Sequence, residues 1–166
     1  DYTLGHARVL VAESADVITT GYGEVPIVFA GRTMAMRYLA GGPSRLRFFD
    51  VDGRARGEAA LPPLSSVDEM EAVEGDLVYS VETYLTPRSF RRRTPDGRDA
   101  TTSLRMTSPV NLDDMEATRA TARSKDGTEI PVNIIRRKGL ALDGSHPTLL
   151  YGYGGYGLSE TPYFLG

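Results

Sequence analysis

Short runs in which hydrophobic and polar residues alternate dominate the first 110 positions of the chain. Residues 33–36 and 45–48 alternate with the two-residue period of a half-buried β-strand. Turn pairs such as Gly41-Gly42, Asp52-Gly53 and Asp96-Gly97 separate the runs. No long 3.6-residue periodicity appears, so the pattern favours strands over helices. The predicted strands of this part are residues 8–11, 26–29, 33–38, 45–49, 77–81 and 89–91.

A weak internal repeat lies within this strand-rich region. Gly31 and Gly75 are 44 residues apart, and each stands just before a strand-like run. Two Asp-Gly-Arg turn triplets, which begin at Asp52 and Asp96, are separated by the same 44 residues. A period of roughly 40–50 residues with several short strands per unit is typical of β-propeller blades. A β-sandwich, which has the same strand content but no fixed period, is the alternative.

The pattern changes after Pro109. Residues 111–116 are acidic and polar and predict a connector. Strands are then predicted at 117–123 and 129–136, with a hairpin turn between them. A continuous apolar run at 148–151 predicts a buried strand that ends in a glycine loop, which is what an α/β sheet places beside its active site. We therefore predict a domain boundary near residue 116.

The glycine loop reads Tyr-Gly-Tyr-Gly-Gly-Tyr-Gly over residues 151–157. Its G-x-G-x-x-G spacing is only a weak indication of nucleotide binding, because a dinucleotide site also needs a helix here and an acidic residue about 20 positions later. A plain glycine-rich turn is a second interpretation. A third is the oxyanion-hole loop of an α/β-hydrolase, in which a preorganised donor such as a tyrosine hydroxyl stabilises the developing negative charge.

Composition limits the classes of function that fit. With 40% hydrophobic and 25% charged residues, the chain reads as soluble and globular. A net charge of −3 argues against a nucleic-acid partner. The lack of cysteine excludes disulfides, thiol catalysis and a cysteine-ligated zinc site. No apolar run approaches the roughly 20 residues that span a bilayer, so we expect no membrane partner.

Both ends of the 166-residue chain look like cuts, since it begins at Asp1 without a methionine and stops just after the glycine loop. We therefore expect a piece of a larger protein. No signal peptide is visible, and we expect a cytoplasmic rather than a secreted location.

Four motifs follow one another in the last part of the chain: residues 124–131, 138–139, 142–147 and 150–156. In order and spacing they resemble the opening of the catalytic domain of the prolyl oligopeptidase family of serine peptidases. The resemblance covers residues 124–166 well. Residues 1–116 resemble the last blades of that family's seven-bladed propeller only through their strand rhythm.

This resemblance implies a β-rich fold with two parts. Residues 1–116 would be the C-terminal part of a β-propeller domain, and residues 117–166 the first strands of a truncated α/β-hydrolase domain. It implies a serine endopeptidase that hydrolyses short peptides after proline through an acyl-enzyme. Its partners would be the short peptide substrate and the rest of the same polypeptide, and it would need no cofactor.

Three site residues follow from the resemblance. Tyr153, the second tyrosine of the motif, would donate its hydroxyl to the oxyanion. Tyr156, where many relatives carry phenylalanine, would line the pocket that accepts the substrate's proline. Leu158 matches a further apolar position of that pocket.

No nucleophile is predicted in these residues, because no G-x-S-x-G elbow occurs. The family's serine, aspartate and histidine correspond to positions downstream, so we expect this chain by itself to be inactive. His6 lies near the start of the chain. Ser145 and His146 share one turn, where neighbouring residues rarely reach the geometry of a triad, so His146 is interpreted as structural.

Asp113, Asp114 and Glu116 are contiguous and lack a histidine partner, so we expect a solvated connector rather than a metal site. Two alternatives to the proline-specific peptidase stay open. One is a non-catalytic β-rich binding or scaffold module. The other is a related oligopeptidase that prefers basic residues.

Overall fold

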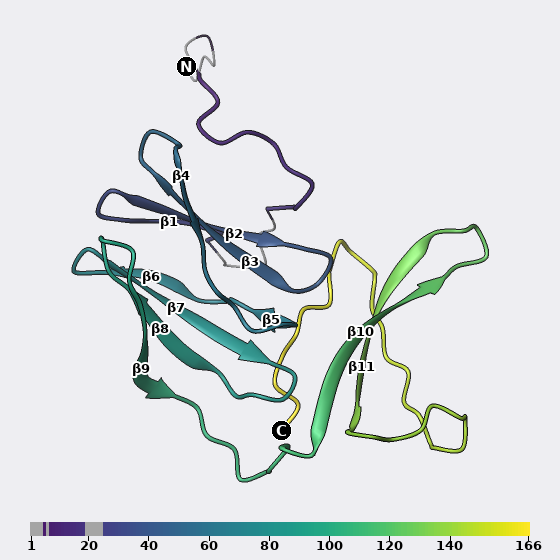
Figure 1. The fold of residues 1–166 in the computed structure, drawn as a ribbon. Coiled ribbons are helices and arrows are strands. Elements are labelled where there is room, and N and C mark those ends of the chain that lie inside the picture. The colour runs from purple at the N-terminus through teal and green to yellow at the C-terminus, as the bar shows by residue number, and fades with distance from the viewer. Residues whose placement is uncertain (1–4, 6, 19–24) are drawn as a thin grey trace.

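The computed structural model describes residue 5, residues 7–18 and residues 25–166, which fold into strands, turns and irregular segments (Figure 1). Within these described residues there is no α-helix, and hence no helix long and apolar enough to cross a membrane. The strands are β1 (Ile27–Ala30), β2 (Thr33–Leu39), β3 (Ser44–Asp50), β4 (Ala55–Glu58), β5 (Ser65–Ser66), β6 (Met70–Val73), β7 (Asp76–Thr83), β8 (Ser89–Arg93), β9 (Asp99–Arg105), β10 (Met115–Arg123) and β11 (Glu129–Arg137).

Two antiparallel meanders form the first part of the structure. The first sheet has the strand order β1-β2-β3-β4. The second has the order β5-β7-β8-β9, with β6 also paired to β7. β5 pairs with the last residues of β7 and β6 with its first four, so the two short strands together line one edge.

The 44-residue repeat is confirmed by these two sheets. Gly31 turns β1 into β2 and Gly75 turns β6 into β7, with φ of 58° and 89°. Gly53 and Gly97 close the hairpins β3–β4 and β8–β9, and each donates its N–H to the carbonyl three residues earlier, at 2.9 and 2.8 Å. The repeated sequence positions therefore occupy the same turns in both sheets.

A shared hydrophobic core joins the two sheets. Phe48 and Leu46 of β3 lie in one cluster with Tyr79 and Leu77 of β7, and all four side chains are fully buried. A second buried cluster lies on the opposite face of the first sheet. Met34 and Phe49 belong to it, whereas their neighbours along the strands, Ala35 and Phe48, belong to the first cluster. The first sheet is therefore covered on both faces, which explains the dense apolar content of its strands.

The predicted strands at 117–123 and 129–136 are confirmed as the hairpin β10–β11, whose nine residue pairs run from Met115↔Arg137 to Arg123↔Glu129. Its turn is closed by the N–H of Ser124, which donates to the Thr128 carbonyl at 2.9 Å. β10 begins at Met115, so the last two residues of the predicted connector belong to this strand instead.

Two other predicted strands are wrong. Residues 8–11 are irregular, and within the described stretch 7–18 the one pairing with the first sheet is the isolated bridge Val17↔Leu39. Residues 148–151 are also irregular, and Leu149 is 92% exposed instead of buried. An apolar run becomes a strand only when a neighbour accepts its backbone hydrogen bonds, and the described hairpin β10–β11 pairs only with itself.

The matched glycines of the repeat give a first prediction. Gly97→Ala should lower the free energy of unfolding by about 1 kcal/mol, because alanine is strained at a φ of 89°. Gly53→Ala should cost about 1–3 kcal/mol more. A Cβ at Gly53 would lie 2.0 Å from the Leu10 carbonyl oxygen, whereas at Gly97 the nearest atom is a side-chain nitrogen of Arg93 at 3.2 Å.

Urea denaturation of the two variants would measure this difference. Since φ at Gly53 is 87°, the backbone strain is matched and Leu10 alone separates the pair. Equal losses would show that the backbone at Leu10 does not lie against the β3–β4 turn.

Candidate functional site

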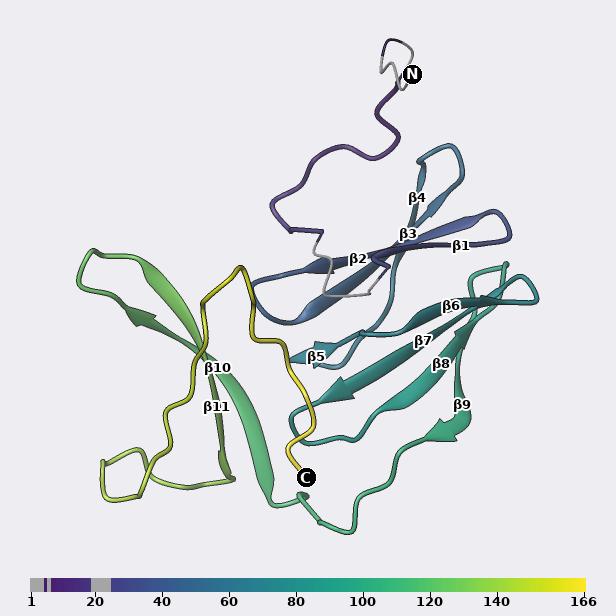
Figure 2. The same cartoon turned by 180° about the vertical axis from the view of Figure 1, so that it is seen from behind.

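The segment that carries the glycine motif is irregular and lies between the hairpin β10–β11 and the ends of the sheets. In both views it runs from the hairpin side towards β5 and the end of β7, where the chain terminus lies (Figures 1 and 2). Because no strand pairing constrains it, its position depends on a few contacts at its two ends.

Tyr156 lies at the tip of a tight turn in this segment. The N–H of Leu158 donates to the Gly155 carbonyl at 3.1 Å, and the two central residues, Tyr156 and Gly157, have φ of 58° and 73°. Positive φ at both central positions is the pattern of a type I′ turn. A tyrosine is strained there, and this turn leaves its side chain 98% exposed.

Tyr153 is half-exposed, and its ring lies against the backbone of Gly155. A Cβ placed on Gly155 would meet the Tyr153 hydroxyl oxygen at 3.5 Å, so that hydroxyl lies close over a residue without a side chain. Leu158, which closes the turn, is 60% exposed. The structure therefore places the three predicted site residues on one short exposed segment, with Tyr153 and Tyr156 on either side of Gly155.

The two arms of this segment approach each other at Tyr151 and Glu160. The nearby Glu160 carboxylate raises the pKa of the Tyr151 hydroxyl, because a negative charge opposes ionisation of a phenol.

The Ser145 hydroxyl donates to Asp143 Oδ1 at 2.6 Å, and its backbone N–H donates to the same oxygen at 3.0 Å. These two bonds lower the pKa of Asp143 and form a small local turn. His146 is exposed beside it. His6 lies outside the residues that the structure describes.

Two of the acidic residues near the predicted domain boundary are paired with arginines of β11. Glu116 contacts Arg136 at 2.8 Å, and Asp114 contacts Arg137 at 3.5 Å. Among the described residues, no group of three or more acidic or histidine side chains is arranged to bind a metal ion.

The turn between β2 and β3 contacts the C-terminal part of the chain. Arg119 of β10 donates to the Gly41 carbonyl at 2.5 Å. The Glu160 carbonyl oxygen lies so close to Gly42 that a Cβ there would meet it at 3.3 Å. This first-sheet turn therefore contacts both the hairpin and the arm that follows the glycine motif.

The end of β7 makes the equivalent contacts from the second sheet. Asn133 of β11 donates its side-chain N–H to the Tyr84 hydroxyl at 2.8 Å, and the N–H of Leu165 donates to the Tyr84 carbonyl at 3.3 Å. Sequence reasoning missed Tyr84, because a tyrosine between two strands carries no signal of a partner 49 residues away.

The chain is similar in sequence to known prolyl endopeptidases and prolyl oligopeptidases. No family model matches it. The prolyl endopeptidase of Elizabethkingia miricola is 28% identical over 151 residues, which are 90% of this chain and 21% of that protein. Prolyl oligopeptidase A of Galerina marginata is 46% identical over 55 residues, which are 33% of this chain and 8% of that protein.

A solved prolyl endopeptidase structure matches with a TM-score of 0.79 and 25% sequence identity, covering 93% of this chain and 22% of that one. The chain therefore spans about a fifth of the length of the prolyl endopeptidases that it matches over most of its own length.

Proposed function

Because these matches confirm the predicted relationship to the prolyl oligopeptidase family, we propose that the chain is part of a serine endopeptidase that hydrolyses short peptides after proline. The observation that carries this proposal is the ordered set of motifs between residues 124 and 156, in a chain aligned over 90% of its length with a prolyl endopeptidase. The activity and the peptide partner belong to the complete protein.

In this proposal residues 1–116 form the last blades of a β-propeller, and residues 117–166 open an α/β-hydrolase domain. The two repeated antiparallel sheets, of four and five strands with a shared core, support the first assignment, since neighbouring blades pack sheet against sheet. The separate hairpin β10–β11 supports the second. The propeller would cover the active site and limit the size of the substrate.

Tyr153 would act on the oxyanion. A serine from outside this chain, assisted by a histidine and an aspartate, would attack the peptide carbonyl after proline, and the carbonyl oxygen would gain negative charge. A tyrosine hydroxyl aimed at that oxygen stabilises the transition state more than the ground state. Tyr153 is half-exposed and its hydroxyl lies close to Gly155, a residue without a side chain, which supports this role.

Tyr156 and Leu158 would form part of the pocket for the substrate's proline ring. A proline ring is apolar and rigid, so an aromatic face and an aliphatic side chain suit it. Both side chains are exposed on the same turn, which supports contact with a ligand. The hydroxyl of Tyr156 would set the fine specificity rather than the class of reaction.

The test is hydrolysis of amide substrates by the complete protein purified from its host. We expect kcat/KM for a Gly-Pro amide to exceed that for the matching Gly-Ala amide by about 10²-fold or more. Faster hydrolysis of a Gly-Arg amide would assign the protein to the branch that prefers basic residues. Hydrolysis of none of the three would favour a non-catalytic module.

A further inference from the structure

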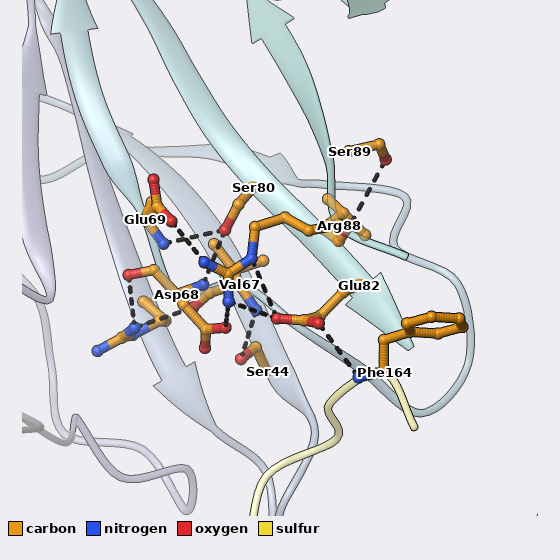
Figure 3. A network of polar contacts seen from close by, with 11 residues as sticks. Ser44, Val67, Asp68, Glu69, Ser80, Glu82, Arg88, Ser89 and Phe164 are labelled. Carbon is orange, nitrogen blue, oxygen red and sulfur yellow. Dashed lines mark hydrogen bonds and ion pairs between the residues drawn. The ribbon is translucent and has the colours of Figure 1, made fainter. Parts of the chain in front are cut away.

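The side chain of Glu82, at the end of β7, is contacted from two directions (Figure 3). Its Oε1 atom accepts hydrogen bonds from Arg88 Nε at 3.1 Å and Arg88 Nη2 at 2.5 Å. Its Oε2 atom accepts the backbone N–H of Phe164 at 3.2 Å. Glu82 is only 7% exposed, so these bonds compete little with water.

Arg88 is shared by three carboxylates, because Asp68 and Glu69 also pair with it, at 2.9 and 2.5 Å. Burial, together with a hydrogen bond to Glu82, raises the pKa of Asp68 to about 6. Burial opposes ionisation of Glu82 too, but hydrogen bonds from Arg88 and from the Phe164 amide hold the pKa of Glu82 below its ordinary value. The ionised form of Glu82 is therefore favoured, and hydrogen bonds to charged acceptors are the stronger ones.

The neighbours of Phe164 are fixed at the same place. The N–H of Leu165 donates to the Tyr84 carbonyl at 3.3 Å, and Pro162 is fully buried. Residues 162–165 are thus attached to the end of β7, whereas the residues between them and β11 pair with no strand. Attachment at both ends reduces the conformations open to an unpaired segment.

We propose that Glu82 is a positioning residue, which attaches residues 162–165 to the end of β7 and so fixes where the glycine segment places Tyr153 and Tyr156. The attachment is independent of the proposed function. Its consequence for catalysis rests on that function. Glu82 and Phe164 are 82 residues apart, and they join the two parts of the chain that we assign to different domains.

Hydrogen exchange compares Glu82→Gln with Glu69→Gln in the complete protein. Both substitutions remove one negative charge beside Arg88, but Glu69 is 54% exposed and only Glu82 bonds to the terminal segment. We expect exchange at the Phe164 and Leu165 amides to quicken by about tenfold or more in Glu82→Gln, the usual effect of losing a bond to a charged group. Glu69→Gln should leave both rates unchanged.

Equal exchange at these amides in the two variants would overturn the proposal. Amides of β7 that pair with β8 report in the same spectra whether the second sheet remains folded. If Glu82→Gln unfolds that sheet, Phe164→Pro takes its place, because it removes the donor and leaves the carboxylates intact. Faster exchange at Leu165 would then support the attachment, and an unchanged rate would overturn it.

Peptide hydrolysis by the complete protein separates this inference from the proposed function. We expect Glu82→Gln to lower kcat/KM several-fold for a Gly-Pro amide, with Glu69→Gln unchanged. Unaltered kcat/KM in Glu82→Gln, with faster exchange at Phe164, would overturn the positioning role. A parent protein that hydrolyses no peptide would refute the proposed function, and the exchange result would still decide the attachment.

Discussion

Tyr153→Phe should lower kcat of the complete enzyme by about 10²-fold or more on a Gly-Pro amide, which is the usual cost of removing one oxyanion donor. The substitution removes a single hydroxyl from a half-exposed ring, so folding and substrate affinity should change little. KM should stay close to its original value, because the lost bond forms fully only in the transition state. Steady-state kinetics of the purified variant would measure both quantities.

Tyr151→Phe is the matched control. It removes a hydroxyl two positions away on the same segment, whose pKa is raised mainly by the charge of Glu160. We expect kcat to stay within about threefold of the original, since no transition-state contact is lost. Unchanged kcat in Tyr153→Phe would refute the oxyanion role of Tyr153, and a similar fall in both variants would indicate a general disturbance of the segment.

Phe48→Ala should lower the free energy of unfolding by about 3–5 kcal/mol, the range for deleting a buried aromatic ring. Phe48 belongs to the first sheet, and its side chain is fully buried in the cluster that includes Tyr79 of the second. The Arg93 guanidinium lies over the Phe48 ring, 3.8 Å from its centre, so the substitution also removes a cation–π contact. Both sheets should therefore be destabilised together.

Phe29→Ala is the control for this prediction, because Phe29 lies in the same sheet but is 55% exposed. Its loss should cost under about 1 kcal/mol. Thermal or urea unfolding followed by circular dichroism would compare the two variants. Similar stability losses would contradict a shared core, and unfolding of the first sheet alone in Phe48→Ala would show that the sheets are independent.

Strands that alternate in the sequence were predictable, and polar edge strands were not. β2 and β3 contain the alternating runs at 33–36 and 45–48, β7 is rich in β-branched and aromatic residues, and each strand was predicted within a few residues. β4 and β9 are almost entirely exposed, so no hydrophobic alternation marks them. They are strands because β3 and β8 offer an open edge, which is a property of the assembled sheet.

Some residues of the candidate site could likewise be identified from the sequence, and others could not. The motif that contains Tyr153 and Tyr156 is contiguous, so the sequence alone could identify it by resemblance. Glu82 and Tyr84 could not be identified, because each meets its partner only after the chain has brought together residues 49 to 82 positions apart. The buried strand predicted at 148–151 was wrong for a related reason, since burial of that run depends on neighbours rather than on its own composition.

The sequence by itself determined the 44-residue repeat, the hairpin β10–β11 and the place of the glycine motif. Each depends on local chemistry: glycine tolerates the positive φ that the turns at Gly53 and Gly97 require, and alternation sets which face of a strand is apolar. Only the tertiary structure decided the pairing of the polar edge strands, the sharing of Arg88 among three carboxylates and the attachment of Phe164 to Glu82. These depend on distances between residues far apart in the chain, which no local pattern encodes.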